Sequence, residues 1–237
     1  MDRGDREHIS RRPEISFPLP DTEYRKLYLD AGSATLQNAQ PEKESSLSYD
    51  AVNGTATFDY TFDRDTELTG YSKLRLWVEV QGSDEMDLFI VVQKADAEGN
   101  FVPTLVMGQI HPGAEAMLRV SHRTLDEVKS TDVIPVQSHL EQLPLKPGEI
   151  VPVDIAIWPS SRFWFAGEKL RVVVSGHYVR DKKWLEPFIW DIHNAGQHIL
   201  HTGMKYDAYL QVPVIPAVRP VIPGKSISSA ELSAMPH

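Results

Sequence analysis

The sequence predicts an all-β protein, folded as a β-sandwich or jelly roll, and three features support this prediction. Apolar residues recur with a period of two, turn-forming residues separate the apolar runs, and long amphipathic helices are absent from the pattern. Strict alternation places one side of a strand against a core and the other side towards water. Many short strands divided by turns are typical of sandwiches and jelly rolls.

The alternation is clearest in residues 73–80, where every second residue is aliphatic. Residues 88–92 (LFIVV) are instead apolar throughout, which is typical of a strand covered on both faces. The alternating residues that we expect to face the core are Leu74, Leu76, Val78 and Val80; Val151, Val153, Ile155 and Ile157; Leu170, Val172 and Val174; and Ala208, Leu210 and Val212.

Turn signals stand between these runs, at residues 98–100 (EGN), 111–113 (HPG) and 146–149 (KPGE). Residues 121–128 form the one segment expected to hold a turn or two of helix. An α/β-hydrolase or Rossmann fold requires several long helices that alternate with strands. The sequence therefore argues against either fold for this chain.

Length, composition and charge exclude several classes of function. The chain has 237 residues, which suits one large β domain, and its formal net charge is -9. Such a charge repels a phosphate backbone, and the basic residues form no stripe, so we expect neither a nucleic-acid nor a membrane partner. There are no cysteines, which excludes a disulfide framework, thiolate zinc sites and a cysteine nucleophile.

The organisation expected along the chain has three parts. Residues 1–13 are charged and lack the apolar region of a signal peptide, so we expect a disordered arm there. Residues 14–219 should form the sandwich, and residues 220–237 a flexible tail. No apolar run approaches the roughly 20 residues of a membrane-spanning helix. Together with the missing cysteines, these features predict a cytoplasmic protein.

The two candidate catalytic motifs in the sequence are both incomplete. The nearest match to the G-x-S-x-G nucleophile elbow is residues 70–74 (GYSKL), where Leu74 replaces the second glycine and a strand follows instead of a helix. Residues 224–226 (GKS) match the end of a phosphate-binding loop, but Arg219 stands at the position of its first glycine. We therefore assign no catalytic residue to this chain.

Two groups of residues could in principle bind a metal. Residues 83–87 (SDEMD) cluster three carboxylates, and Asp84 and Asp87 are candidate calcium ligands, although acidic loop tips are more often simply solvated. His193, His198 and His201 are spaced by five and three residues. Metal-binding pairs are two apart on a strand and four apart on a helix, so structural roles are favoured for these histidines.

Aromatic residues suggest a binding site. Trp184, Trp190 and Tyr178 could line a cleft at the loop end of the sandwich and stack on a carbohydrate or another small ligand. The alternative is that tryptophans fill the core or an interface, because an aromatic ring buries much apolar area. Trp77 is on the outward register of its strand, so we expect another surface to cover it.

Several segments follow one another in a recognisable order: ELTG at 67–70, DEMDLF at 84–89, DAEG at 96–99, LRVSHR at 118–123, LKPGE at 145–149, FWFAGEKLR at 163–171, GQHILHTG at 196–203 and YLQVP at 209–213. Upstream stand FPLPD at 17–21 and LYL at 27–29. This ordered set resembles the C-terminal domain of the Xaa-Pro dipeptidyl-peptidase and cocaine-esterase hydrolases. The resemblance covers roughly residues 15–216, and its specificity comes from the order and not from any single motif.

The resemblance implies a galactose-binding-like jelly-roll sandwich. In whole members of the family this module follows an α/β-hydrolase domain that carries a Ser-Asp-His triad, packs against that domain and helps to shape its active site. The triad has no counterpart here, and His198 and His201 match a strand-end pattern of the non-catalytic module. No cofactor is implied.

The expected function is therefore that of a non-catalytic C-terminal sandwich of a serine hydrolase, without activity of its own. The parent reaction would be acyl transfer to water, on an amide after proline or on an ester. The expected partners are an α/β-hydrolase domain, in the same parent chain or a separate protein, and further copies of the chain in a homo-oligomer. The alternative is a stand-alone module that binds a carbohydrate or another small ligand.

Overall fold

The computed structural model describes residues 13–14, 16–106, 109–179 and 191–216. These residues form thirteen strands and one short 3-10 helix. In chain order the elements are β1 (Glu23–Asp30), β2 (Thr35–Gln37), β3 (Ser45–Asp50), β4 (Thr55–Thr61), β5 (Thr66–Gln81), β6 (Asp87–Ala95), β7 (Thr104–Val106), β8 (Gln109–His111), β9 (Ala114–Arg119), η2 (Val120–His122), β10 (Val151–Trp164), β11 (Lys169–Ser175), β12 (Gln197–Thr202) and β13 (Tyr209–Ile215).

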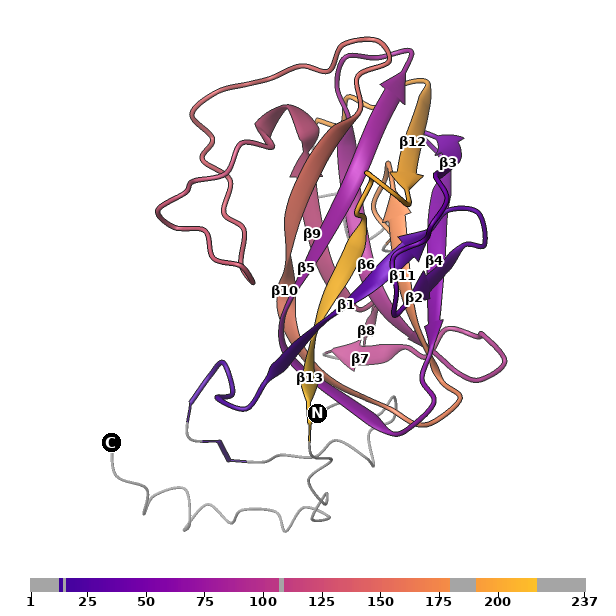
Figure 1. Cartoon of the computed structure of the whole chain (residues 1–237), viewed down its shortest axis with the longest axis vertical. Coiled ribbons are helices and arrows are strands. Elements are labelled where there is room, and N and C mark those ends of the chain that lie inside the picture. Colours follow the sequence, from indigo (N-terminus) through magenta and orange to yellow (C-terminus); the bar gives the residue numbers. More distant parts are fainter. Residues whose placement is uncertain (1–12, 15, 107–108, 180–190, 217–237) are drawn as a thin grey trace.

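Eleven strands form one sheet in the order β3-β12-β5-β13-β1-β2-β4-β11-β6-β9, with β10 paired to β5 outside this path, while β7 and β8 form a separate hairpin (Figure 1). All pairs are antiparallel except the single bridge between β2 and β4. The sheet folds back on itself, so that β5 and β10 share one hydrophobic core with β4, β6 and β11. The predicted all-β sandwich is confirmed.

The longest pair, β5 with β10, shows why the sequence alternates. Val151 lies opposite Val78, and the antiparallel register continues along both strands, with an irregularity between Ile157 and Ser160. Every alternating residue that was expected to face the core in β5, β10, β11 and β13 is buried. Because alternate side chains point to opposite faces, this burial requires a period of two in the sequence.

β13 departs from simple alternation, because all seven of its residues are buried. It lies between β1 and β5, and its second face is covered as well. The ring of Tyr28 meets that of Tyr209 edge-on at 6.0 Å, and the amide of Gln211 donates to the carbonyl of Asp132. The cover therefore comes partly from the long segment between η2 and β10.

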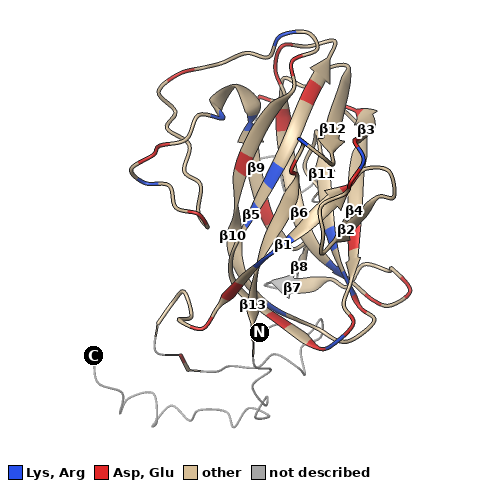
Figure 2. Cartoon of the chain, viewed as in Figure 1, with Lys and Arg blue, Asp and Glu red and all other residues tan. Residues whose placement is uncertain are grey.

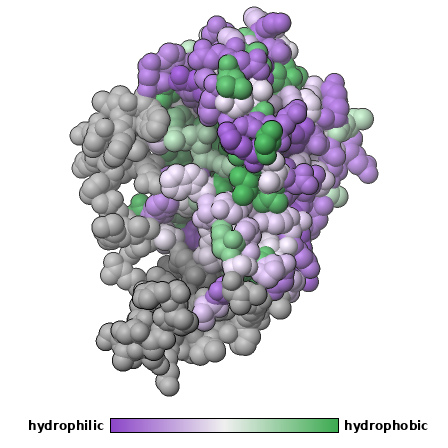
Figure 3. Space-filling model, turned by 90° about the vertical axis from the view of Figure 1, so that its left-hand side faces the viewer, coloured by the Kyte–Doolittle hydropathy of each residue, from purple (hydrophilic) through white to green (hydrophobic). Residues whose placement is uncertain are grey.

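That segment, residues 123–150, is an excursion from the sandwich, and we call it the β9–β10 excursion. The helix expected over residues 121–128 is reduced to the single turn of η2. The backbone N–H of Asp126 instead donates to Val136 O at 2.8 Å, so the excursion is held by its own bonds. It lies on the left of Figure 1, the side that Figure 3 views face-on, where apolar side chains gather between hydrophilic ones. Val128 and Leu140 are almost fully exposed on it.

Several other expectations can be located on the fold. The beginning of β1 lies beside the end of β13, with Glu23 opposite Val214, so both ends of the sandwich leave from the same place. The expected arm, apart from residue 13, and the whole expected tail (220–237) fall outside the described residues, as do residues 217–219 at the end of the expected sandwich. Acidic and basic residues are interspersed over the strands in the view of Figure 2. None of the helices in the described part of the chain is long and apolar enough to cross a membrane.

Candidate functional site

A hollow of about 510 Å³ opens near the ends of β6 and β9. Its floor is apolar, with Leu88 and Phe89 from β6 and Met117 from β9. Its remaining lining side chains are mainly polar or aromatic: Asp87, Arg119, His122, Gln137, His139, Tyr178 and Asp191, with Leu118 and Ile192 completing the wall. An apolar concavity with a few polar groups at its edge is the usual form of a small-ligand site.

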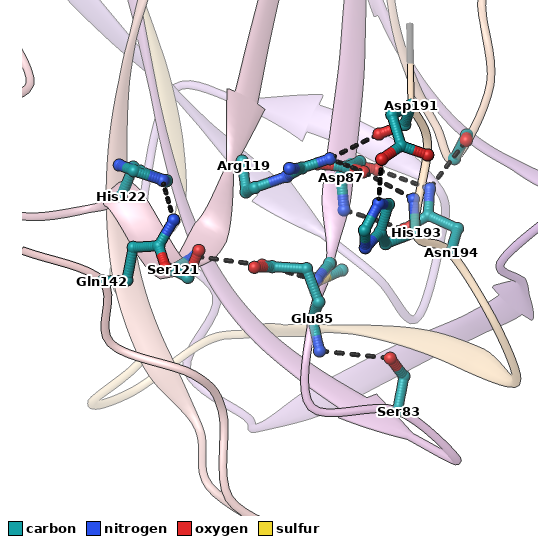
Figure 4. A network of polar contacts seen from close by, with 12 residues as sticks. Ser83, Glu85, Asp87, Arg119, Ser121, His122, Gln142, Asp191, His193 and Asn194 are labelled. Atoms are coloured by element: carbon teal, nitrogen blue, oxygen red, sulfur yellow. Dashed lines mark hydrogen bonds and ion pairs between the residues drawn. The ribbon is translucent and has the colours of Figure 1, made fainter. Parts of the chain in front are cut away.

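The central polar contact of this site joins β6 and β9. Asp87 and Arg119 are direct partners in the antiparallel register. The guanidinium holds the carboxylate with two parallel bonds, from Nε to Oδ1 at 2.8 Å and from Nη2 to Oδ2 at 3.0 Å (Figure 4). Bidentate pairs of this kind are the stronger class of hydrogen bond. The bond to Asp87 is the main reason that the pKa of Arg119 is raised above its ordinary value.

Asn194 fastens the connection between β11 and β12 to the same place. Its side-chain amide donates to the carbonyls of Asp87 and Gly176, at 2.8 and 2.7 Å, while its oxygen accepts from the N–H of Asp87 at 2.7 Å (Figure 4). The backbone N–H of His193 adds a bond to the Asp87 carboxylate at 2.9 Å. Asn194 thus links the start of this connection, at Gly176, to the first residue of β6.

Asp191 lies at the outer edge of the network. Its carboxylate is 2.7 Å from Nε2 of His193, and its backbone oxygen accepts a bond from Arg119 at 2.6 Å. The hydrogen bond from His193 and the charges of His193 and Arg119 lower the pKa of Asp191. A fixed anion therefore stands at the edge of the hollow, exposed to water.

The predicted ligand-binding residues are only partly visible. Tyr178 does line the hollow, and its ring centroid lies 4.4 Å from that of Phe89. Trp184 and Trp190 lie outside the described residues. The predicted aromatic site is therefore represented by Tyr178 alone, and it stays a prediction.

The two predicted calcium ligands differ in their surroundings. Asp84 is exposed, whereas Asp87 is buried and both of its oxygens accept bonds from Arg119. Glu85 from the same acidic run accepts bonds from the backbone N–H groups of Met86 and Ser121 (Figure 4). Among the described residues, no three histidine or acidic side chains are grouped so that they could hold a metal. The calcium prediction gains no support from this geometry.

The three C-terminal histidines do not share a site. His198 is fully buried on β12, and its Nδ1 lies 3.1 Å from the hydroxyl of Tyr49. His201 lies on the same strand but is three residues along, and its Nε2 is 2.9 Å from Glu79. His193 pairs with Asp191. Each ring has a separate partner, as a structural role requires.

The remaining sequence candidates are located as follows. Ser72 lies within β5 opposite Ile157, and not on a strand-to-helix elbow. Residues 224–226 lie outside the described residues. Trp77 does point outward, but its cover comes from this chain itself. Its indole donates to Asp207 at 2.9 Å, and Tyr206 packs edge-on against it at 5.5 Å.

Comparison with known protein families identifies the family of this chain. A family model described as the X-Pro dipeptidyl-peptidase C-terminal non-catalytic domain matches residues 1–211. The chain belongs to this family. No curated protein matched the sequence. The membership confirms the resemblance noted from the ordered sequence segments.

Among solved structures, this family member is similar to a CocE/NonD family hydrolase from Staphylococcus aureus. The two are 39% identical over 86% of this chain, with a TM-score of 0.79. An aminopeptidase from the archaeon Thaumarchaeota archaeon (12% identity, TM-score 0.59, 85% of this chain) and an α-amino acid ester hydrolase (14%, 0.54, 80%) share the fold. The chain spans only 36 to 38% of the length of these proteins.

Sequence reasoning did not find the polar network itself. The sequence assigned no role to Arg119, which stands in a family-like segment, or to Asn194, which stands between His193 and His198. Their partners come from strands and connections that are remote in sequence, because Asn194 is 107 residues from Asp87. A pairing of β6 with β9, had it been known, would have placed Arg119 opposite Asp87.

Proposed function

We propose that this chain is the non-catalytic C-terminal β-sandwich of a serine hydrolase of the Xaa-Pro dipeptidyl-peptidase and esterase type. In this proposal it packs on an α/β-hydrolase domain and helps to shape the active site there. The observation that carries the proposal is the family match over residues 1–211, in a chain that spans 38% of the length of the CocE/NonD hydrolase it resembles. The remaining length of such a protein would supply the nucleophile.

The features of the described residues fit this role. Ser72, the nearest match to a nucleophile elbow, lies inside a strand, where its hydroxyl lacks the exposed turn that a nucleophile requires. The hollow at the ends of β6 and β9 is open, and its polar edge offers groups that could face a substrate entrance. We propose hydrolysis of an amide after proline, or of an ester, as the reaction of the assembled protein.

The proposal also includes a fold type, a cellular location and an oligomeric state. We propose the galactose-binding-like type of jelly roll for the sandwich, a cytoplasmic location in keeping with a sequence without cysteine, and self-association of the assembled protein. Light scattering of the purified chain, alone and fused to a hydrolase domain, tests the last of these.

A chimera tests the main proposal. The C-terminal domain of the S. aureus hydrolase would be replaced by this chain, and labelling by a fluorophosphonate probe and ester hydrolysis would be measured. We expect the chimera to be labelled and active, the hydrolase portion alone to be impaired, and this chain alone to remain unlabelled. A fusion to an unrelated β-sandwich of similar size is the matched control. Labelling of the isolated chain, or an inactive but folded chimera, would contradict the proposal.

A stand-alone binding module is the second candidate, and the hollow beside Tyr178 favours it. The partly exposed ring of Tyr178, packed on the buried Phe89 with centroids 4.4 Å apart, can offer a surface for a sugar or another planar ligand. Binding of the isolated chain to a glycan array, abolished by Tyr178→Ala but not by Tyr60→Ala, would support it. An array without binding would leave the hydrolase role as the better account.

A further inference from the structure

Two histidines at the edge of the hollow stand apart from the Asp87 network. His122 ends η2, and His139 belongs to the β9–β10 excursion. Their Nδ1 atoms are 3.5 Å apart, their ring centroids are 5.4 Å apart, and the ring planes are inclined by 47°. Both side chains line the hollow, so the space in front of them is open to small molecules.

The backbone holds this pair in place. The N–H of Ser138 donates to Thr124 O at 2.9 Å, and the N–H of Leu143 donates to Ser121 O at 2.8 Å, so hydrogen bonds join the two segments on either side of the rings. His139 has a φ of 52°, a left-handed conformation that non-glycine residues adopt only occasionally. Such strain persists where the surrounding structure fixes it, and it is often associated with function.

The distances fit two nitrogens that share a metal better than two that share a hydrogen. Two zinc–imidazole bonds of about 2.1 Å at a tetrahedral angle put the nitrogens about 3.4 Å apart and the ring centroids about 5.3 Å apart. A straight N–H···N bond at the observed nitrogen separation of 3.5 Å would put the centroids about 5.8 Å apart. Hydrogen bonds of normal strength also have a shorter donor–acceptor distance than 3.5 Å. The observed 3.5 and 5.4 Å are close to the metal-binding values.

The side chain of Gln142 contacts the ring of His122. Its side-chain amide lies 3.1 Å from Nε2 of that ring, the nitrogen that faces away from His139 (Figure 4). The contacting atom is the amide nitrogen; rotation of the amide by about 180°, which exchanges its nitrogen and oxygen, lets Gln142 accept the Nε2 hydrogen and leaves the Nδ1 lone pair of His122 available. Metal-binding histidines are usually oriented by an acceptor in this way.

We propose that His122 and His139 bind one divalent transition-metal ion through their Nδ1 atoms. Imidazole pairs favour Cu²⁺, Ni²⁺ and Zn²⁺ over Mg²⁺ and Ca²⁺, which prefer oxygen. Because the described residues provide no third histidine or acidic ligand, water or a small molecule in the hollow completes the coordination. The site is therefore weaker than a four-ligand structural zinc site and open to exchange. It is independent of the hydrolase role.

Titration of the metal-free full chain tests the site. Cu²⁺ and Zn²⁺ would be followed by calorimetry at pH 7.5, and the Cu²⁺ form by electron paramagnetic resonance. We expect one ion per chain, couplings to two imidazole nitrogens, no heat with Mg²⁺ or Ca²⁺, and weaker binding as the pH falls because protons compete for the nitrogens. His122→Gln and His139→Asn should each weaken binding at least about ten-fold, as loss of a ligand does.

Matched variants separate this site from other histidines. His111→Gln removes a ring 3.8 Å from a carboxylate, that of Glu115, and should leave the affinity within about two-fold. Asparagine is chosen at position 139 because it tolerates a positive φ, and circular dichroism would verify that each variant is folded. Absence of binding in the wild type, unchanged affinity in both folded site variants, or loss of binding in His111→Gln would overturn the proposal.

Discussion

The β5–β10 pair and the polar end around Asp87 are stabilised in different ways. In the first region, Leu74, Leu76 and Val78 are buried against a shared apolar core. In the second, a few directional hydrogen bonds join Asp87, Arg119 and Asn194. Apolar burial depends on area and period, whereas hydrogen bonds depend on the identity and direction of each group. Substitutions should therefore affect the two regions differently.

The largest effect is expected in the apolar region. Leu74→Ala leaves a cavity at a residue without exposed surface, and it should lower the free energy of unfolding by about 4 kcal/mol. Urea denaturation monitored by tryptophan fluorescence measures the change. Leu140→Ala is the matched control, because Leu140 is 89% exposed and its truncation should change stability by less than about 0.5 kcal/mol. Equal effects of the two variants would contradict the burial of β5.

A buried histidine provides the next test, because it introduces a polar group into the sandwich. Burial lowers the pKa of His198 to about 4, from the 6.5 of an ordinary histidine. Its Nε2 has no hydrogen-bond partner among the described residues. Between pH 6.5 and about 4 the unfolded chain takes up a proton that the folded chain refuses, so stability falls as the pH falls through this window.

The size of the loss is about 3 kcal/mol by pH 4, and it is absent above pH 6.5, where both states are neutral. His198→Gln should remove this part of the pH dependence, as measured by urea denaturation at several pH values. His193→Gln, at a half-exposed ring, should leave it in place. A wild-type slope that survives in His198→Gln would show that another group is responsible.

Features that depend on local sequence could be predicted, whereas contacts between distant segments could not. Leu74, Val153 and Val172 were placed in the core correctly, because strand alternation is a local property of the chain. β13 was expected to be half exposed, since nothing in its own sequence shows that the β9–β10 excursion covers it. Arg119 could not be assigned to Asp87, because the order of strands in a sheet depends on contacts between distant segments.

The cover over Trp77 also depends on a contact between segments that are distant in sequence. The outward register of Trp77 was correct, but the sequence did not show that residues 206 and 207 fold back over it. The family resemblance was the most informative signal for function, because it depends on the order of many segments and not on one site. His122 and His139 drew no attention as a pair, since they are 17 residues apart and on irregular backbone.

A smaller effect is expected at the polar end. Asp87→Asn removes the charge that Arg119 binds and should cost about 2 kcal/mol in the free energy of unfolding. In a double-mutant cycle with Arg119→Met, we expect a coupling of about 1 kcal/mol. The exposed pair of Arg25 and Glu23, at 2.6 Å, is the control, and Glu23→Gln should cost less than about 0.5 kcal/mol. Absence of coupling between Asp87 and Arg119 would mean that the bidentate bond does not stabilise this end.

The smallest effect is expected where the two kinds of stabilisation meet. Trp77 packs against the apolar core and also donates an indole hydrogen bond to Asp207 at 2.9 Å. Trp77→Phe keeps most of the apolar area but loses this bond, so it should cost about 1 kcal/mol in the free energy of unfolding. Trp158→Phe, at a ring that is 76% exposed, should have almost no effect. If Trp77→Phe also proves neutral, the indole hydrogen bond to Asp207 does not contribute to the stability of the sandwich.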